Sequence, residues 1–236
     1  MVNKTPLALP LPDGQVVDVH LSHKARTRIS LNISAQGEVR LSIPPKVTER
    51  DALAFLQTHR GWLMQHLQKH TDIVKAAALP LDEISYLGER LPLERLAGQR
   101  QTARLQGGVL QVHGADEEAQ LRQTVGHWLY RQAAIILPGR AGELAEQFGA
   151  RPAKVALSSA GRRWGSCTVQ GNIRINWRLI QSPPAVIDYV IAHELAHLWH
   201  MNHSPAFWAQ VEQWCADWHQ HRRWLRAHGE QLFALG

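Results

Sequence analysis

Alternating apolar and polar residues predict a β-rich beginning of the chain. Residues 27–34 place apolar side chains at every second position, and residues 38–43 repeat the pattern after a short segment that contains Gly37. Because successive side chains of a strand point to opposite faces, the two segments predict a hairpin with one buried face. Residues 16–20 also alternate and predict a further strand.

A helix is predicted after this hairpin. Thr48 and Asp51 form a capping pattern, and apolar residues then recur at helical spacing, so we expect one helix over residues 48–69. Further short strands are expected over residues 84–93, 103–105 and 109–113. Gly107 and Gly108 predict the turn between the last two strands.

The second half of the chain has a mainly helical pattern. Within residues 116–147, apolar side chains recur at helical spacing, and Pro138 followed by a glycine predicts an interruption of this helix. Ser182 and Ser204 each precede a proline, an arrangement typical of a helix start. The two serines therefore predict one helix after Ser182 and a final helix from Ser204 to about residue 226.

Two strands are expected before the helix that follows Ser182. Residues 155–157 are apolar, and residues 173–179 alternate strictly, with Arg174, Asn176 and Arg178 on one face. We expect the apolar face of the second strand to pack on that helix.

These elements predict an α+β fold. At 236 residues the chain can bury a full hydrophobic core. Residues 1–112 would form a β-rich N-terminal region with one helix, and residues 113–236 a second region that carries the chemistry. A single continuous domain from about residue 20 to residue 230 is the alternative.

Composition argues against several protein classes. No apolar run approaches the ~18 residues of a membrane span, and the first residues lack the pattern of a secretory signal. Two cysteines, Cys167 and Cys215, are too few for a disulfide framework, so we expect a cytoplasmic protein that does not bind membranes. The net charge of +6 indicates at most weak affinity for nucleic acid.

The clearest chemical pattern is His193-Glu194-Leu195-Ala196-His197. Positions four apart lie on one face of an α-helix, about one turn apart, so His193 and His197 can bind one metal ion through their imidazole nitrogens. Glu194 lies beside the first ligand, where its carboxylate can accept a proton from a water molecule at the metal. A metal also compensates for the cost of placing such polar groups in an apolar helix.

A third ligand is expected, because a catalytic zinc site usually has three protein ligands and one open position. His200 would share a face with His193 in a continuing helix, but roughly 10 Å along the axis. That is too far for zinc–nitrogen bonds of about 2.0–2.1 Å. His203 can return to the site if the chain turns at Asn202, since asparagine tolerates the left-handed conformation. We therefore expect one zinc ion on His193, His197 and His203.

This part of the chain resembles the YgjP-like metallopeptidase domain family, which is related to the SprT-like zinc proteins. The specific likeness covers residues 158–208. It is carried by Arg163-Trp164-Gly165-Ser166-Cys167, the alternating strand after it, the pattern His193-Glu194 with His197, and Asn202-His203-Ser204 followed by Phe207 and Trp208.

The resemblance implies a zincin-like core, in which an antiparallel sheet packs on the helix of the H-E-x-x-H motif. It implies that His193, His197 and His203 bind zinc, that Glu194 is the catalytic base, and that the segment beginning with Arg163 lies close to the site. Hydrolysis of nucleoside triphosphates has also been attached to this group, so the resemblance leaves the substrate open.

Three functions follow as hypotheses. The first is a zinc metallopeptidase that acts on a peptide or an unfolded protein, bound as an added strand beside residues 173–179. The second is a nucleoside triphosphate pyrophosphatase of the UTP type, with Arg163, Arg174 and Arg178 on the phosphates. The third is a DNA-associated binding protein with a structural zinc ion. In the enzymes, Arg163 is also a candidate catalytic residue, because a guanidinium is a fixed, forked donor for an oxyanion.

Overall fold

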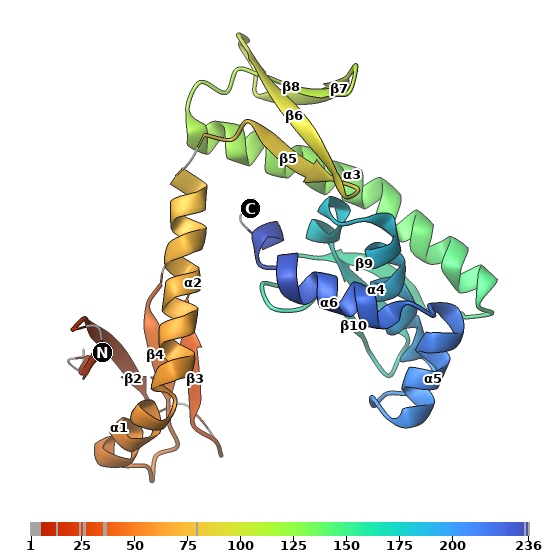
Figure 1. Ribbon diagram of the computed structural model, residues 1–236. Coiled ribbons are helices and arrows are strands. Elements are labelled where there is room, and N and C mark those ends of the chain that lie inside the picture. The colour runs from red at the N-terminus through yellow and green to blue at the C-terminus, as the bar shows by residue number, and fades with distance from the viewer. Residues whose placement is uncertain are drawn as a thin grey trace. The chain divides into compact units, whose positions relative to one another are not determined.

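In the computed structural model, the chain divides into two units, Met1–Leu79 and Pro80–Gly236 (Figure 1). The structure describes residues 6–12, 14–23, 25, 27–34, 37–78, 80–233 and 235, with the side chains of residues 69, 70 and 72–78 outside this description. Both units combine helices with small mixed sheets, which confirms the predicted α+β class.

The first unit packs two helices on one sheet. The sheet has the order β1-β2-β4-β3, with β1 (Leu7–Pro10), β2 (Val16–Ser22), β3 (Ser30–Ile33) and β4 (Val39–Ser42). β3 and β4 pair antiparallel, which confirms the predicted hairpin, and Val39, Leu41 and Ile43 are buried as its pattern requires. The middle of the segment that joins these strands, at residues 35 and 36, lies outside the described residues.

The predicted helix over residues 48–69 is two helices, α1 (Glu49–Thr58) and α2 (Arg60–Ala78). The capping pattern is confirmed, since Thr48 and Asp51 each accept a hydrogen bond from the backbone N–H of the other. The break lies at His59, which leaves helical backbone geometry. Leu56 and Leu63 on either side of it are both buried at helical spacing, and so the apolar pattern does not reveal the break.

The second unit begins with a four-stranded sheet of order β5-β6-β8-β7. Its strands are β5 (Glu83–Tyr86), β6 (Glu89–Leu96), β7 (Thr102–Gln106) and β8 (Val109–His113). Gly107 and Gly108 both have positive φ and form the predicted turn. Val112 of β8 and Val125 of the next helix lie in the same core. The boundary between the units, at residues 79/80, therefore differs from the division at 112/113 suggested by the sequence.

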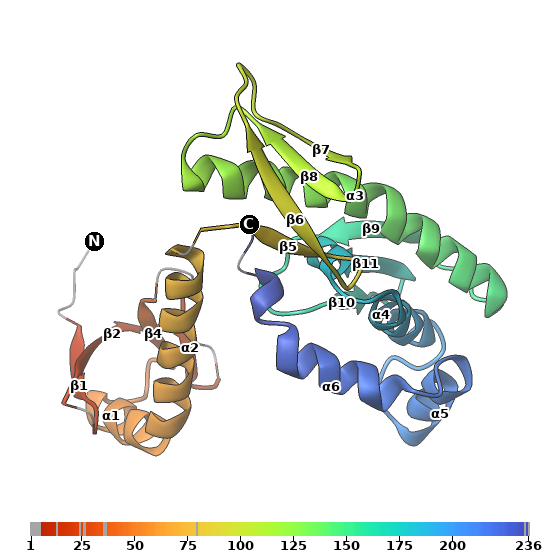
Figure 2. The ribbon, with the colours of Figure 1, turned by 45° about the horizontal axis from the view of Figure 1, so that its top comes forward.

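A long helix, α3 (Glu118–Gln147), runs along the second unit between two sets of elements (Figure 2). It contacts the β5–β8 sheet as well as the elements that carry the candidate site. The predicted interruption at Pro138 and Gly139 is wrong, because the helix continues through Pro138. Proline removes one hydrogen bond of the helix, but Leu137 and Ala141 around it are fully buried, so tertiary packing maintains the helix.

The second sheet of this unit has the order β10-β11-β9, with β9 (Lys154–Ser158), β10 (Gly165–Cys167) and β11 (Asn172–Asn176). The prediction of an antiparallel sheet is wrong for one pair, because β9 and β11 are parallel. The chain leaves β9, forms β10 on the far side of β11, and returns antiparallel to it as β11. β9 and β11 thus run in the same direction, with β10 in the connection that parallel strands require.

The strand predicted over residues 173–179 ends at Asn176 and continues as a short 3-10 helix, η1 (Trp177–Gln181). The expectation that Asn176 and Arg178 face away from the core is wrong. Asn176 is completely buried, accepts a hydrogen bond from the N–H of Arg178, and donates to the carbonyls of Ala160 and Arg163. It therefore fixes the loop before β10.

Arg178 is buried as well, and its guanidinium lies over two aromatic rings. Its Cζ is 4.5 Å from the ring centroid of Trp177 and 5.2 Å from that of Phe233. This stacking keeps Arg178 away from the surface that would be needed to bind a substrate phosphate.

The helix after Ser182 is α4 (Pro184–Ala196), and most of its residues are buried. Ser182 does not cap it, since its hydroxyl donates to the carbonyl of Leu179 instead. Ser204 does cap α5 (Pro205–Trp214), as predicted. The final helix does not run on to residue 226, because the chain turns at residues 215–217 and continues as α6 (Trp218–His228) and then η2 (Gln231–Phe233). In the described residues, no helix is both long enough and apolar enough to span a bilayer.

An ion pair joins α3 to α4. The Nε and Nη2 groups of Arg140 each donate to one carboxylate oxygen of Asp188, both at 2.8 Å. The pair is partly exposed, so we expect Arg140→Ala to lower the free energy of unfolding by about 1 kcal/mol. Urea unfolding measures this change, with Arg131→Ala on the exposed face of the same helix as the control. Equal losses in both variants would show that the pair contributes no stability.

Candidate metal centre

α4 places a glutamate and a histidine at the edge of the core. Glu194 is 5% exposed and His193 is partly buried. The helix ends at Ala196, and His197 is its C-cap residue, so the helical spacing between the two histidines is kept. Their rings are 5.1 Å apart, centroid to centroid.

The chain turns directly after α4, but without the left-handed conformation expected at Asn202, because Leu87 is the only non-glycine residue with positive φ among the described residues. The turn orients His197. The Nδ1 atom of His197 lies 2.9 Å from the carbonyl oxygen of His200. Since a carbonyl can only accept, Nδ1 carries the proton, and the Nε2 atom of His197 remains available as a ligand. His200 contributes its backbone to the site, and its side chain is not part of the histidine cluster.

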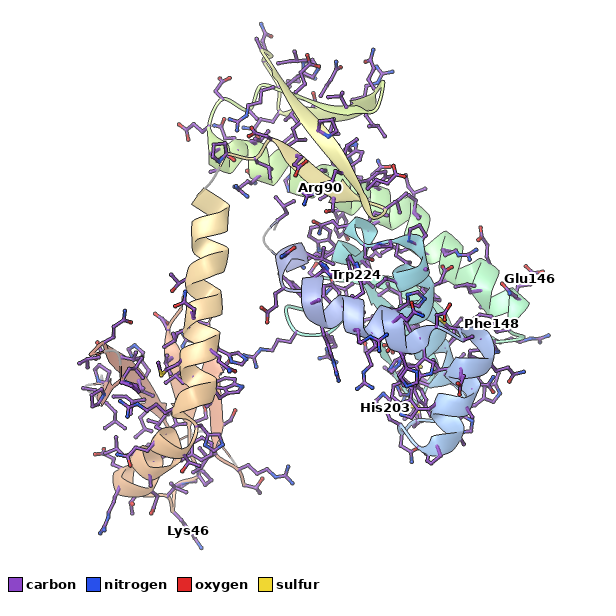
Figure 3. All side chains as sticks on the ribbon, in the orientation of Figure 1. Lys46, Arg90, Glu146, Phe148, His203 and Trp224 are labelled. Carbon is purple, nitrogen blue, oxygen red and sulfur yellow. The ribbon has the colours of Figure 1, made fainter. Side chains whose placement is uncertain are left out.

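His203 returns to the same place just before α5, and Figure 3 labels it there. Its Nε2 atom lies 3.1 Å from Nε2 of His193. One ligand atom from each of His193, His197 and His203 lies within 4.8 Å of the others. A tetrahedral ion with zinc–nitrogen bonds of about 2.0–2.1 Å holds its nitrogens about 3.3–3.4 Å apart. The three imidazoles that the sequence analysis singled out thus lie close enough together to hold a metal ion.

The protonation of the cluster also fits a metal. Burial, together with the charges of His197 and His203, lowers the pKa of His193 to about 3. Burial also lowers the pKa of His203, with His197 and Arg222 adding to the effect. Both imidazoles are therefore neutral near pH 7, which is the form that binds metal ions.

Aromatic residues of α5 hold the three imidazoles. The ring of Phe207 lies 4.9, 4.6 and 4.8 Å from the rings of His193, His197 and His203. Trp208 stacks on His203 with a centroid distance of 5.7 Å. The cap at Ser204 thus starts a helix whose first turn supports the cluster.

The carboxyl of Glu194 is packed against the backbone of β10. A Cβ atom added to Gly165 would come within 2.5 Å of the side chain of Glu194, so only glycine allows this approach. Burial raises the pKa of Glu194 to about 8, and the charge of Arg163 opposes this shift. Arg163 is exposed and close enough for its charge to act on this carboxyl, whereas its expected role toward an oxyanion or a phosphate stays a prediction.

A cavity of about 360 Å³ opens beside this carboxyl. Its walls are formed by Trp164, Gly165, Tyr189, Val190, His193, Glu194, Arg222, Leu225 and Arg226. Tyr189 therefore borders the cavity, besides packing 6.1 Å from the ring of His193.

Arg222 and Arg226 were not identified from the sequence. In a single straight helix from residue 204, Arg222 would lie roughly 27 Å from its start. The turn at residues 215–217 instead folds α6 back, so that its arginines line the same cavity as His193 and Glu194. The i, i+4 spacing in the sequence indicates that the two arginines share one helix face. It does not reveal that this face lines the cavity, because the turn before α6 depends on tertiary packing.

Comparison with known proteins gives one match. A family model described as YgjP-like, metallopeptidase domain, matches residues 27–228. None of the curated proteins matches the chain, and neither does any solved structure.

Proposed function

The chain belongs to the YgjP-like metallopeptidase domain family, and from this premise we propose that it is a zinc-dependent metallopeptidase with Glu194 as the general base. The observation that supports the proposal is a cluster of three imidazoles, one of which, His193, lines a cavity together with the buried carboxyl of Glu194. Three histidine donors are typical of a catalytic zinc site, which keeps one position open.

A bound zinc ion would supply Lewis acidity, polarising a peptide carbonyl and lowering the pKa of a water molecule toward neutrality. The protein groups then act on the proton. In its ionised form Glu194 accepts it from the attacking water, and the same carboxyl can return it to the leaving amine. The contact with Gly165 restricts where this carboxyl can lie. Arg163 contributes positive charge close to the base.

The position of β10 supports binding of an extended peptide. The sequence suggested residues 173–179 as the edge strand, but β11 is paired on both sides, and the edge strands are β9 and β10. β10 also contacts α4, and its Gly165 touches Glu194. A peptide that adds to β10 by β-augmentation would therefore pass beside the base.

The structure gives less support to the two alternatives. In the nucleotide hypothesis Arg163, Arg174 and Arg178 were to form one basic edge, but Arg178 is buried under aromatic rings. In the DNA-binding hypothesis the zinc would be structural and normally have four protein ligands. The cluster found among the described residues offers three.

The proposal is tested by a substrate screen of the zinc-loaded protein. We expect hydrolysis of peptides or unfolded protein by the unaltered protein and not by Glu194→Gln. The screen includes nucleoside triphosphates. Hydrolysis of these, without hydrolysis of peptides or protein, would favour the pyrophosphatase hypothesis. Binding to DNA that weakens steeply with salt, without any hydrolysis, would favour the third hypothesis.

Gly165 provides a second prediction. In Gly165→Ala the new methyl group would overlap the carboxyl of Glu194, so we expect peptide hydrolysis to fall at least about tenfold while zinc content is unchanged. Steady-state kinetics and metal analysis check this result. Gly161→Ala, in the preceding loop and with open space for a methyl group, is the control. Full activity of Gly165→Ala would show that the position of the carboxyl is not critical.

A further inference from the structure

Two arginines of α6 line the cavity beside the metal centre. Arg222 and Arg226 are four residues apart, so they project from one face of the helix, and both border the cavity together with His193 and Glu194. In the part of the chain that the structure describes, neither takes part in an ion pair. Like charges at this spacing repel each other, and a bound anion would relieve this repulsion.

The guanidinium of Arg222 is positioned by aromatic rings. Its Cζ lies 5.2 Å from the ring centroid of Trp208 and 6.0 Å from that of Trp218. These two rings stack on each other at 4.2 Å, and Trp208 also stacks on His203. Arg222 is thus attached to the same aromatic stack as one of the histidines, which places its charge beside the site.

The other walls of the cavity complement this charge. Trp164, Val190 and Leu225 are apolar, and Glu194 provides the single carboxyl among the lining residues. Since Glu194 acts as the base in the proposed function, it is not a permanent partner for either guanidinium. The cavity therefore suits a group with an apolar body and an anionic end, and its volume of about 360 Å³ can hold a substrate residue.

We propose that Arg222 and Arg226 bind a carboxylate of the peptide substrate and so select the residue that enters the cavity. The inference rests on the proposed peptidase function and names its substrate class. Guanidinium groups match carboxylates in geometry as well as charge. The carboxylate has two possible sources, the free C-terminus of the peptide or an acidic side chain.

Binding can be measured without turnover in zinc-loaded Glu194→Gln. One pair of probes is acetyl-Ala-Ala-Leu with a free carboxylate and the same peptide as its C-terminal amide. The other pair is acetyl-Ala-Ala-Glu-amide and acetyl-Ala-Ala-Gln-amide. In one of the two pairs we expect the carboxylate form to bind about tenfold or more tightly by calorimetry. The pair that shows the difference identifies the source of the carboxylate.

Variants then assign the preference to the arginines. Adding Arg222→Gln and Arg226→Gln together should make the carboxylate probe and its neutral counterpart bind with nearly equal dissociation constants. Lysine at both positions instead should retain part of the preference for the carboxylate. Arg223→Gln removes the same charge from an exposed neighbour outside the cavity, and the preference should survive. Lack of preference in both pairs, or a preference that survives the double replacement in protein with normal zinc content, would overturn the inference.

The proposed peptidase function and the carboxylate site can be disproved separately. If the peptides bind with this preference but the unaltered protein cleaves none, the proposed function is wrong and the carboxylate site stands. If the protein cleaves the acid and amide forms equally well, the function stands and the carboxylate site is wrong.

Discussion

Replacing His203 by alanine is expected to remove both the metal and the activity, whereas replacing His200 by alanine should leave the metal bound. His203 points its Nε2 at Nε2 of His193, 3.1 Å away. His200 supports the site through its backbone carbonyl, which alanine retains. Loss of an outer partner of a metal ligand typically weakens binding 10–100-fold. Loss of His203 itself should therefore weaken it by more than about 100-fold.

Metal analysis of the two purified variants, after dialysis against a weak chelator, measures this difference. Circular dichroism serves as the control for folding, because His203 is exposed and its replacement should not disturb the core. A variant His200→Ala that loses the metal, beside a His203→Ala protein that keeps it, would show that the third ligand is misassigned.

Glu194→Gln is expected to keep the metal and lose turnover by at least about 100-fold, the usual cost of removing a general base. Glutamine has almost the same shape, so it fits beside Gly165, and its amide can still hydrogen-bond to water. It cannot accept the proton. Peptide hydrolysis by protein of measured zinc content checks this expectation.

A matched control is available within the same protein. Glu146→Gln changes the charge equally at an exposed position near the end of α3, and it should leave turnover unchanged. Hydrolysis at the original rate by Glu194→Gln would rule out the carboxyl as the base, whatever the metal content.

The spacing of His193 and His197, and the helix start after His203, could be predicted because both depend on local geometry. The spacing of His193 and His197 follows from the helical period, and Ser204 with Pro205 starts a new helix in the structure as in the sequence pattern. The hairpin of β3 and β4 has the same local origin. In each case, residues close together in the sequence are sufficient to predict the local structure.

Features that depend on tertiary contacts could not be predicted. Asn176 and Arg178 follow the polar positions of a strand, yet a capping hydrogen bond and aromatic stacking bury both. Pro138 is tolerated because packing outweighs the lost hydrogen bond. Arg222 reaches the cavity because the chain turns before α6. No periodicity in the sequence describes these contacts.

X-ray absorption at the metal edge of the zinc-loaded protein would identify the metal ligands themselves. We expect three imidazole nitrogens at about 2.0–2.1 Å, one further oxygen and no sulfur. In His203→Ala, any residual metal should show fewer imidazole ligands. A shell containing sulfur, or one closed by four protein ligands in the unaltered protein, would contradict an open catalytic centre on His193, His197 and His203.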